Sequence, residues 1–246
     1  MLTFIVNAIK IIFLLGILVF IHEGGHFIVA KLCKVRVNEF ALGFGKTIIS
    51  KKIGETTYAL RIIPLGGFVR LEGEEQPSEE SGSFSKAKIW QKILIVAAGG
   101  LVNIIFAIII VFLIVMIYYK YPLKETLQVT GTFAYSIIDS IKMLFSGNVT
   151  VNELVGPVGI SSIIVQTTEL VNYIYLIAAI SLSLGVTNLL PIPPLDGGKI
   201  VIYIIEGIRR KPLKEETEVA IQMTGFVCII LLSVFVMMND IGHIAK

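Results

Sequence analysis

The sequence predicts an α-helical polytopic membrane protein with four transmembrane helices and a small cytoplasmic, membrane-associated β-hairpin element. Of its 246 residues, 55% are hydrophobic and only 16% are charged, whereas about a quarter of a typical soluble domain is charged. The apolar residues also gather in four long runs that are nearly free of charge. Runs of this length are typical of helices that cross a bilayer.

We place the four spans at about residues 5–30, 93–119, 171–190 and 219–238. A helix rises about 1.5 Å per residue, so roughly 20 apolar residues cross the hydrocarbon layer. The first run contains Lys10 but stays apolar to Ala30, and the second, Ile93 to Tyr119, has no charge. The last two runs are each about the minimum length for a span.

The distribution of basic residues predicts the orientation. Of 21 Lys and Arg residues, 11 lie between Lys31 and Lys92 and five between Lys199 and Lys214. The positive-inside rule places both of these loops in the cytoplasm, so with four spans both termini are extracytoplasmic. The start lacks a basic n-region and a cleavage site, which favours a retained helix over a cleaved signal peptide. The charges form no basic stripe, so no nucleic-acid partner is expected.

The three connecting segments have different predicted structures. Residues 31–91 contain β-branched stretches punctuated by glycine and proline, which predicts a cytoplasmic β-loop region. The outer segment, residues 120–170, has apolar residues at helical spacing between Ile137 and Phe145, which predicts an amphipathic helix on the outer membrane surface. Gly198 to Arg210 is expected to form a cytoplasmic interfacial helix, and residues 1–246 a single domain.

The end of the first span carries His22, Glu23 and His26 in the pattern HExxH. Residues four apart on a helix project from one face, so both imidazoles can bind one zinc ion. Glu23 can then accept a proton from a water that attacks a carbonyl and deliver it to the leaving amine. Because ionisable residues are costly in lipid, their presence at this depth indicates a functional site.

A hydrolytic zinc site normally has a third protein ligand, and Asp196 is our choice for it. It follows a run of prolines and precedes two glycines, which break the third span at its predicted cytoplasmic end. Irregular backbone at membrane depth is tolerated where it faces protein or a water-filled cavity. Glu39 ranks second because it lies in the loop after the helix. His243 lies beyond the last span, on the opposite side, and is expected to take no part.

Five motifs spread over nearly the whole chain carry a family resemblance: HEGGH at 22–26, ALGFG at 41–45, IPLGGF at 63–68, GPVG at 156–159 and the segment Asn188 to Gly198. In these motifs the chain resembles the site-2 proteases, a family of intramembrane zinc metalloproteases. It is most similar to the bacterial branch that cleaves membrane-anchored anti-sigma factors. The pairing of HExxH with NxxPxxxxDG, in that order and on those spans, is specific to this family.

The resemblance implies the roles of the site residues. It implies that His22, His26 and Asp196 bind one Zn²⁺ per chain, that Glu23 is the catalytic base, and that Asn188 helps to hold the substrate. The loop from Arg61 to Leu71 is expected to reach the membrane as a β-hairpin and to pair with an unwound substrate segment through residues that include Pro64, Gly66 and Gly67. Asn103 is expected near the substrate or in a structural interhelical hydrogen bond.

The resemblance also implies the biological setting. The expected substrates are single-pass membrane proteins, first anti-sigma factors already trimmed on the outside and next remnant signal peptides. The expected location is the bacterial inner membrane, in contact with its lipid, with the active site inside the bilayer near the cytoplasmic side. Bacterial members commonly carry PDZ domains between the second and third spans. Residues 120–170 are too few to hold one.

Three alternatives remain open from the sequence. A metal-ion transporter would also place His and Asp inside spans, but Glu23 would then have no use as a base. A non-catalytic membrane scaffold would keep the fold and bind helices without cutting them. A different membrane zinc protease would use a Glu in place of Asp196 as its third ligand.

Overall fold

The computed structural model describes residues 2–76, 78–146 and 156–244. Its α-helices are α1 (Leu2–Leu32), α2 (Ile89–Leu113), α3 (Leu123–Ser146), α4 (Pro157–Gln166), α5 (Leu170–Asn188), α6 (Asp196–Arg209) and α7 (Glu215–Ile244). A short 3₁₀ turn, η1 (Phe84–Lys86), precedes α2, and a π-helical turn, η2 (Ile114–Tyr118), continues it. The two strands are β1 (Val37–Ile53) and β2 (Thr56–Leu71).

Four helices within this described part are long and apolar enough to cross a membrane: Thr3–Leu32, Ile89–Tyr118, Leu170–Asn188 and Glu215–Asp240. Only 6% of the most apolar window of the last helix is buried inside the protein. Most of its apolar side chains are therefore not covered by the described part of the chain, which is the exposure expected of a helix that crosses a membrane. The predicted mainly helical chain with four apolar helices and a small β element is confirmed.

The chain forms two compact units, each built from separate chain segments. One unit contains Ile12–Asn103 and Leu184–Gln222, and therefore both strands and α6. The other contains the described residues of Met1–Ile11, Ile104–Ser183 and Met223–Lys246.

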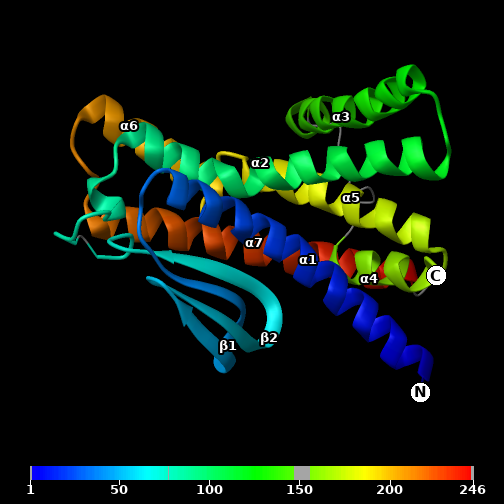
Figure 1. Ribbon diagram of the computed structural model, residues 1–246, viewed down its shortest axis with the longest axis horizontal. Helices are drawn as coiled ribbons and strands as arrows, with labels where there is room; N and C mark the ends of the chain where they lie inside the picture. The colour runs from blue at the N-terminus through cyan, green and yellow to red at the C-terminus, as the bar shows by residue number, and fades with distance from the viewer. Residues whose placement is uncertain (1, 77, 147–155, 245–246) are drawn as a thin grey trace. The chain divides into compact units, whose positions relative to one another are not determined.

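The strands form one long, strongly curved antiparallel hairpin (Figure 1). The hairpin folds back on itself, so the first half of β1 has neighbours on both sides: Phe40 pairs with Tyr58 and also with Val69. Residues 67–71, in contrast, pair only with residues 37–42. Among the described residues, this end of β2 therefore has one side without a strand partner.

A buried apolar cluster joins this hairpin to the helices of its unit. Its buried members come from α1, the strands, η1, α2 and α6: Ala30, Val35, Val37, Leu71, Phe84, Ile95, Val96 and Tyr203. Burial of apolar surface contributes about 25 cal/mol per Å². The cluster thus fixes the end of β2 against α1, α2 and α6, the elements that carry the site described below.

The second unit has its own apolar cluster between α2 with η2 and α5, made of Ala107, Val111, Val115, Ala178 and Leu182. The outer segment forms α3, in the region where the sequence predicts an amphipathic helix, and Phe133 and Ile137 of α3 pack against this cluster.

Asp240 of α7 joins that helix to the beginning of α4. Its carboxylate accepts hydrogen bonds from the backbone N–H groups of Gly156 and Gly159, at 3.2 and 2.9 Å. The first N–H groups of a helix have no partner within the helix and favour negative charge. Asp240 therefore caps α4 from a distant part of the sequence, and Gly156 is needed there because a Cβ atom would lie 2.7 Å from Asp240 Oδ2.

Candidate metal centre and active site

The two histidines of the HExxH pattern lie side by side on one face of α1. Their rings meet edge to face, with centroids 4.8 Å apart, and their Nε2 atoms are 3.3 Å apart. The spacing of four residues produces this arrangement, because it places side chains one turn apart on the same face.

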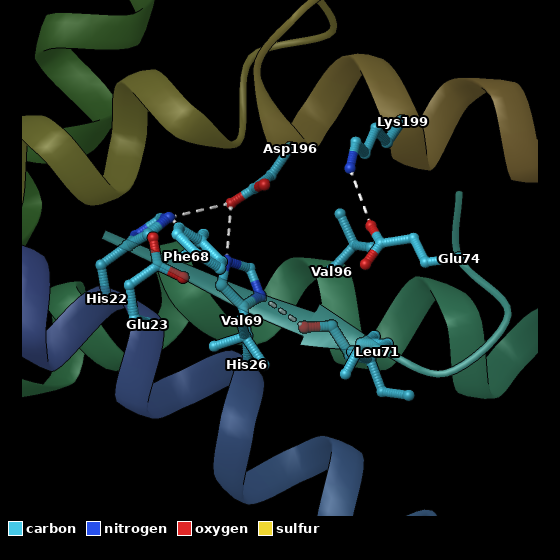
Figure 2. Close-up of a pocket in the computed structure, with 11 residues that line it drawn as sticks. His22, Glu23, His26, Phe68, Val69, Leu71, Glu74, Val96, Asp196 and Lys199 are labelled. Atoms are coloured by element: carbon cyan, nitrogen blue, oxygen red, sulfur yellow. Dashed lines mark hydrogen bonds and ion pairs between the residues drawn. The ribbon is translucent and has the colours of Figure 1, made fainter. Parts of the chain in front are cut away.

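Asp196 belongs to the second chain segment of the same unit, Leu184–Gln222. The backbone between α5 and α6 contains Pro191, Pro193 and Pro194, and α6 begins at Asp196. Figure 2 shows the Asp196 carboxylate directed at the two imidazoles. Its Oδ2 atom lies 3.2 Å from Nε2 of His22 and 3.4 Å from Nε2 of His26.

These three atoms match the geometry of a metal centre. In a tetrahedral zinc site with bonds of about 2.0–2.1 Å, neighbouring ligand atoms lie about 3.3 Å apart. The three separations here are 3.2, 3.3 and 3.4 Å. Asp196 Oδ2 is also buried without a hydrogen bond in the described part of the chain. A divalent cation between the three atoms would satisfy this oxygen, so the residues fit zinc.

Helix α2 orients both imidazoles through their other ring nitrogens. Nδ1 of His26 donates to the carbonyl oxygen of Ile95 at 2.8 Å. Nδ1 of His22 lies 3.3 Å from Nδ2 of Asn103, whose side chain is completely buried. Such outer contacts fix the ring orientation of metal-binding histidines. The sequence left two expectations for Asn103, a place near the substrate or a hydrogen bond between helices. The structure shows a contact of the second kind, from α2 to a histidine of the site on α1.

Gly99 leaves the space that the imidazoles occupy. A Cβ atom on Gly99 would collide with the rings of both His26 and His22, and one on Gly25 would lie 2.5 Å from the carbonyl oxygen of Ala98. These glycines let α1 and α2 approach closely, as small residues do at helix contacts in membranes. The HExxH pattern contains no signal for Gly99, because the requirement depends on how α2 faces α1.

Glu23 lines the same cavity as the three candidate ligands, together with Phe68, Val69, Leu71, Glu74, Ile95, Val96 and Lys199. The edge strand at the end of β2 therefore forms one wall. Gly67, the first residue of this end of β2, lies close to Glu23: a Cβ atom there would be 3.2 Å from Glu23 Cγ and 2.8 Å from the carbonyl oxygen of Ala41. This position has no room for a larger residue.

The other expected substrate-binding residues lie in different places. Gly66 has a φ angle of +115°, and a Cβ atom there would collide with the ring of Phe44. The residue is therefore required by the course of the backbone. Pro64 is exposed in β2, and Asn188 ends α5. Neither Pro64 nor Asn188 is among the residues that line the cavity.

Glu39, the second choice for a ligand from the sequence, is not part of this cluster. Both carboxylate oxygens of Glu39 are engaged by arginines, with Arg61 at 2.6 Å and Arg70 at 3.3 Å. The side chain of His243 lies outside the described part of the chain. Among the described residues, the group that could hold a metal ion is His22, His26 and Asp196.

An ion pair that the sequence did not indicate lies on the cavity wall. Lys199, one turn after Asp196 on α6, donates to Oε1 of Glu74 at 3.0 Å (Figure 2). Burial disfavours the ammonium, but the charge of Glu74 and its hydrogen bond outweigh this and raise the pKa of Lys199. The pair ties the segment after β2 to the helix that carries Asp196.

Metallopeptidases use three metal ligands and a nearby carboxylate in one cavity. Here two of the three candidate ligands and Glu23 lie on α1, a helix apolar enough to cross a membrane, and Asp196 begins the short helix α6. Comparison with known proteins leads to the same class. Residues 10–232 match Peptidase family M50, and the chain belongs to this family.

Its relatives carry matching names. The zinc metalloprotease RasP of Bacillus licheniformis is 24% identical over 97% of this chain and 99% of its own length. A protein of Fusobacterium nucleatum with the provisional name of zinc metalloprotease is 25% identical over 93% of this chain and 96% of its own length. RasP of Shouchella clausii is 40% identical, over 51% of this chain and 31% of that protein.

The first two alignments run over 415 and 327 positions, more than the 246 residues of this chain, so these relatives contain residues without a counterpart here. The expected resemblance to the site-2 proteases is confirmed, and the chain is a zinc-dependent protease.

Proposed function

We propose that this protein is an intramembrane endopeptidase that hydrolyses peptide bonds within or beside the transmembrane segment of single-pass membrane proteins. His22, His26 and Asp196 hold one zinc ion, and Glu23 is the catalytic base. The observation that carries this proposal is the set of nearly equal separations among the three ligand atoms, 3.2 to 3.4 Å, beside a cavity lined by Glu23.

The chain's own residues divide the chemistry between them. Bound zinc would supply Lewis-acid activation of water and of the scissile carbonyl group. Glu23 accepts the proton of the attacking water and passes it to the nitrogen of the leaving amine. The contacts of α2 with Nδ1 of His26 and of His22 hold the two rings in place during this exchange.

The free side of residues 67–71 suits an extended substrate. A helix hides its peptide groups in its own hydrogen bonds, so a protease has to take its substrate unwound. The edge strand offers backbone N–H and C=O groups that can pair with the released substrate backbone. Phe68, Val69 and Leu71 of this strand line the cavity that contains Glu23, so a paired substrate would pass beside the base.

The proposed setting follows the family and the charge distribution. The four apolar helices cross a bacterial inner membrane, both termini are extracytoplasmic, and the active site lies within the membrane near the cytoplasmic side. Residues 1–246 act as one protease domain with no PDZ domain in the outer segment 120–170. Anti-sigma factors and remnant signal peptides are the proposed substrates.

The test measures zinc content and cleavage of a model single-pass substrate in liposomes, for the wild type, Glu23→Gln and Asp196→Ala. We expect one zinc per wild-type chain and cleavage, zinc without cleavage for Glu23→Gln, and loss of both for Asp196→Ala. Cleavage by Glu23→Gln, or a wild type without zinc, would refute the mechanism. Normal zinc content in Asp196→Ala would show that another residue is the third ligand.

A further inference from the structure

Asn103 is a polar residue in one of the most apolar helices of the chain. Its side chain has no exposed surface, and its Nδ2 atom lies 3.3 Å from Nδ1 of His22. A buried amide costs free energy unless it forms hydrogen bonds. Its contact with a candidate zinc ligand therefore calls for a functional explanation beyond a polar contact between helices.

The position of Asn103 on α2 is part of a regular pattern. Ile95, Gly99 and Asn103 are spaced by four residues and lie along one face of the helix. Ile95 binds Nδ1 of His26 through its carbonyl oxygen, Gly99 leaves room for both imidazoles, and Asn103 contacts Nδ1 of His22. This stripe therefore gives each imidazole one contact on α2, with Gly99 between the two contacts.

The protonation of imidazole explains why a metal-binding histidine needs a hydrogen-bond partner such as Asn103. A neutral imidazole has one proton, and a ring that binds metal through Nε2 carries it on Nδ1. That proton needs an acceptor. For His26 the acceptor is the carbonyl oxygen of Ile95. For His22 the group at the equivalent place is the side-chain amide of Asn103.

We propose that Asn103 is a positioning residue for the metal ligand His22. An amide carries an acceptor and a donor, and a half-turn of the group exchanges them. In one orientation Nδ2 donates to an unprotonated Nδ1, and in the other Oδ1 accepts the proton of Nδ1 when Nε2 binds zinc. Asn103 thereby holds the ring in both states. This inference rests on the proposed zinc site and replaces the substrate-binding role expected for Asn103.

The test uses the full chain in detergent and two measurements of the metal. Zinc affinity is measured by competition with a chromogenic chelator, and the visible spectrum is recorded after replacement of zinc by Co²⁺. The variants are Asn103→Leu, which keeps the size but removes the hydrogen bond, and Asn103→Asp, which keeps an acceptor. Ser181→Ala is the matched control, because Ser181 is another completely buried polar residue in an apolar helix and does not line the cavity.

We expect Asn103→Leu to weaken zinc binding about 10- to 100-fold and to change the Co²⁺ spectrum. Asn103→Asp should restore most of the affinity, and Ser181→Ala should bind zinc like the wild type. If Asn103→Leu does not fold, Asn103→Ala takes its place, because it removes the amide without adding bulk.

Two results would overturn the inference. Wild-type zinc affinity and an unchanged Co²⁺ spectrum in Asn103→Leu, with reduced thermal stability, would assign Asn103 to helix packing. The same metal properties with a raised KM for substrate would assign it to substrate binding. A wild type that binds no zinc would instead refute the proposed function itself, so the two failures are distinguishable.

Discussion

The imidazole of His26 donates its Nδ1 proton to the carbonyl oxygen of Ile95, with 2.8 Å between the two atoms. A carbonyl oxygen only accepts hydrogen bonds, so the proton of the neutral ring must be on Nδ1. Nε2 is then left with its lone pair facing Asp196. One backbone contact between α1 and α2 thus prepares this ring to bind a metal ion.

This contact makes His26→Asn an informative variant. The amide nitrogen of asparagine occupies roughly the place of Nδ1, so it can still donate to Ile95, but it has no atom at the place of Nε2. We expect His26→Asn to keep the thermal stability of the metal-free protein and to lose zinc, as measured by melting in detergent and by metal analysis. Zinc bound at wild-type stoichiometry would exclude His26 as a ligand.

Gly99→Ala should damage the site although it adds a single methyl group. The added Cβ atom would collide with both imidazoles, and overpacking of this kind costs about 1–3 kcal/mol. We expect a lower melting temperature and weaker zinc binding by chelator competition. Gly16→Ala on α1 is the control, since nothing lies within 4 Å of a Cβ atom there. Equal effects of the two substitutions would contradict the proposed steric role of Gly99.

Glu74→Gln should loosen the wall of the cavity. Lys199 and Glu74 are 29% and 23% exposed, and leaving one charge of such a pair without its partner costs about 1–3 kcal/mol. We expect a lower melting temperature and slower cleavage, with zinc still bound. Glu75→Gln is the control, because the Glu75 side chain is 80% exposed and surface ion pairs contribute little. If Glu74→Gln cleaves substrate at the same rate as Glu75→Gln, Glu74 has no role in the active site.

The same ion pair has a defined pH dependence. Because the folded protein raises the pKa of Lys199, its contribution to stability is fully present below the unfolded pKa of lysine, about 10.4. It is lost as pH rises through the raised value. The difference in melting temperature between wild type and Glu74→Gln should therefore stay constant around neutral pH and shrink only in strongly alkaline solution.

Asp240→Ala should destabilise the protein without affecting the metal. It leaves the N–H groups of Gly156 and Gly159 without the carboxylate that caps α4, at a cost of about 1–2 kcal/mol. None of these residues lines the cavity, so zinc affinity should be unchanged. Asp139→Ala, at a side chain that is 72% exposed, should change neither property. A loss of zinc affinity in Asp240→Ala would show coupling that these contacts do not explain.

The helices and the metal-binding pattern could be predicted from the sequence because both depend on local spacing. Uncharged runs predict apolar helices, and a separation of four residues places His22 and His26 on one face. Asp196 could be selected because the prolines and glycines around it interrupt a helix at membrane depth. Each of these inferences needs only the residues of one segment.

The contacts of α2 could not be predicted in this way. Ile95 acts through its backbone, Gly99 through the absence of a side chain, and Asn103 through the rotation of α2 about its axis. Each depends on which face of one helix meets another. The sequence of α2 is apolar on nearly all sides, so it does not indicate which face that is. The ion pair of Glu74 with Lys199 joins positions 125 residues apart, and neither residue belongs to a pattern that would select it.

The unit that contains the metal ligands is made of two chain segments, Ile12–Asn103 and Leu184–Gln222. The first supplies His22 and His26, and the second supplies Asp196. Between these segments, the residues that the structure describes contribute none to the lining of the cavity. Evolution could therefore lengthen or shorten that stretch without changing the spacing of the ligands within either segment, and a single catalytic unit could acquire or lose accessory domains while its chemistry stayed the same.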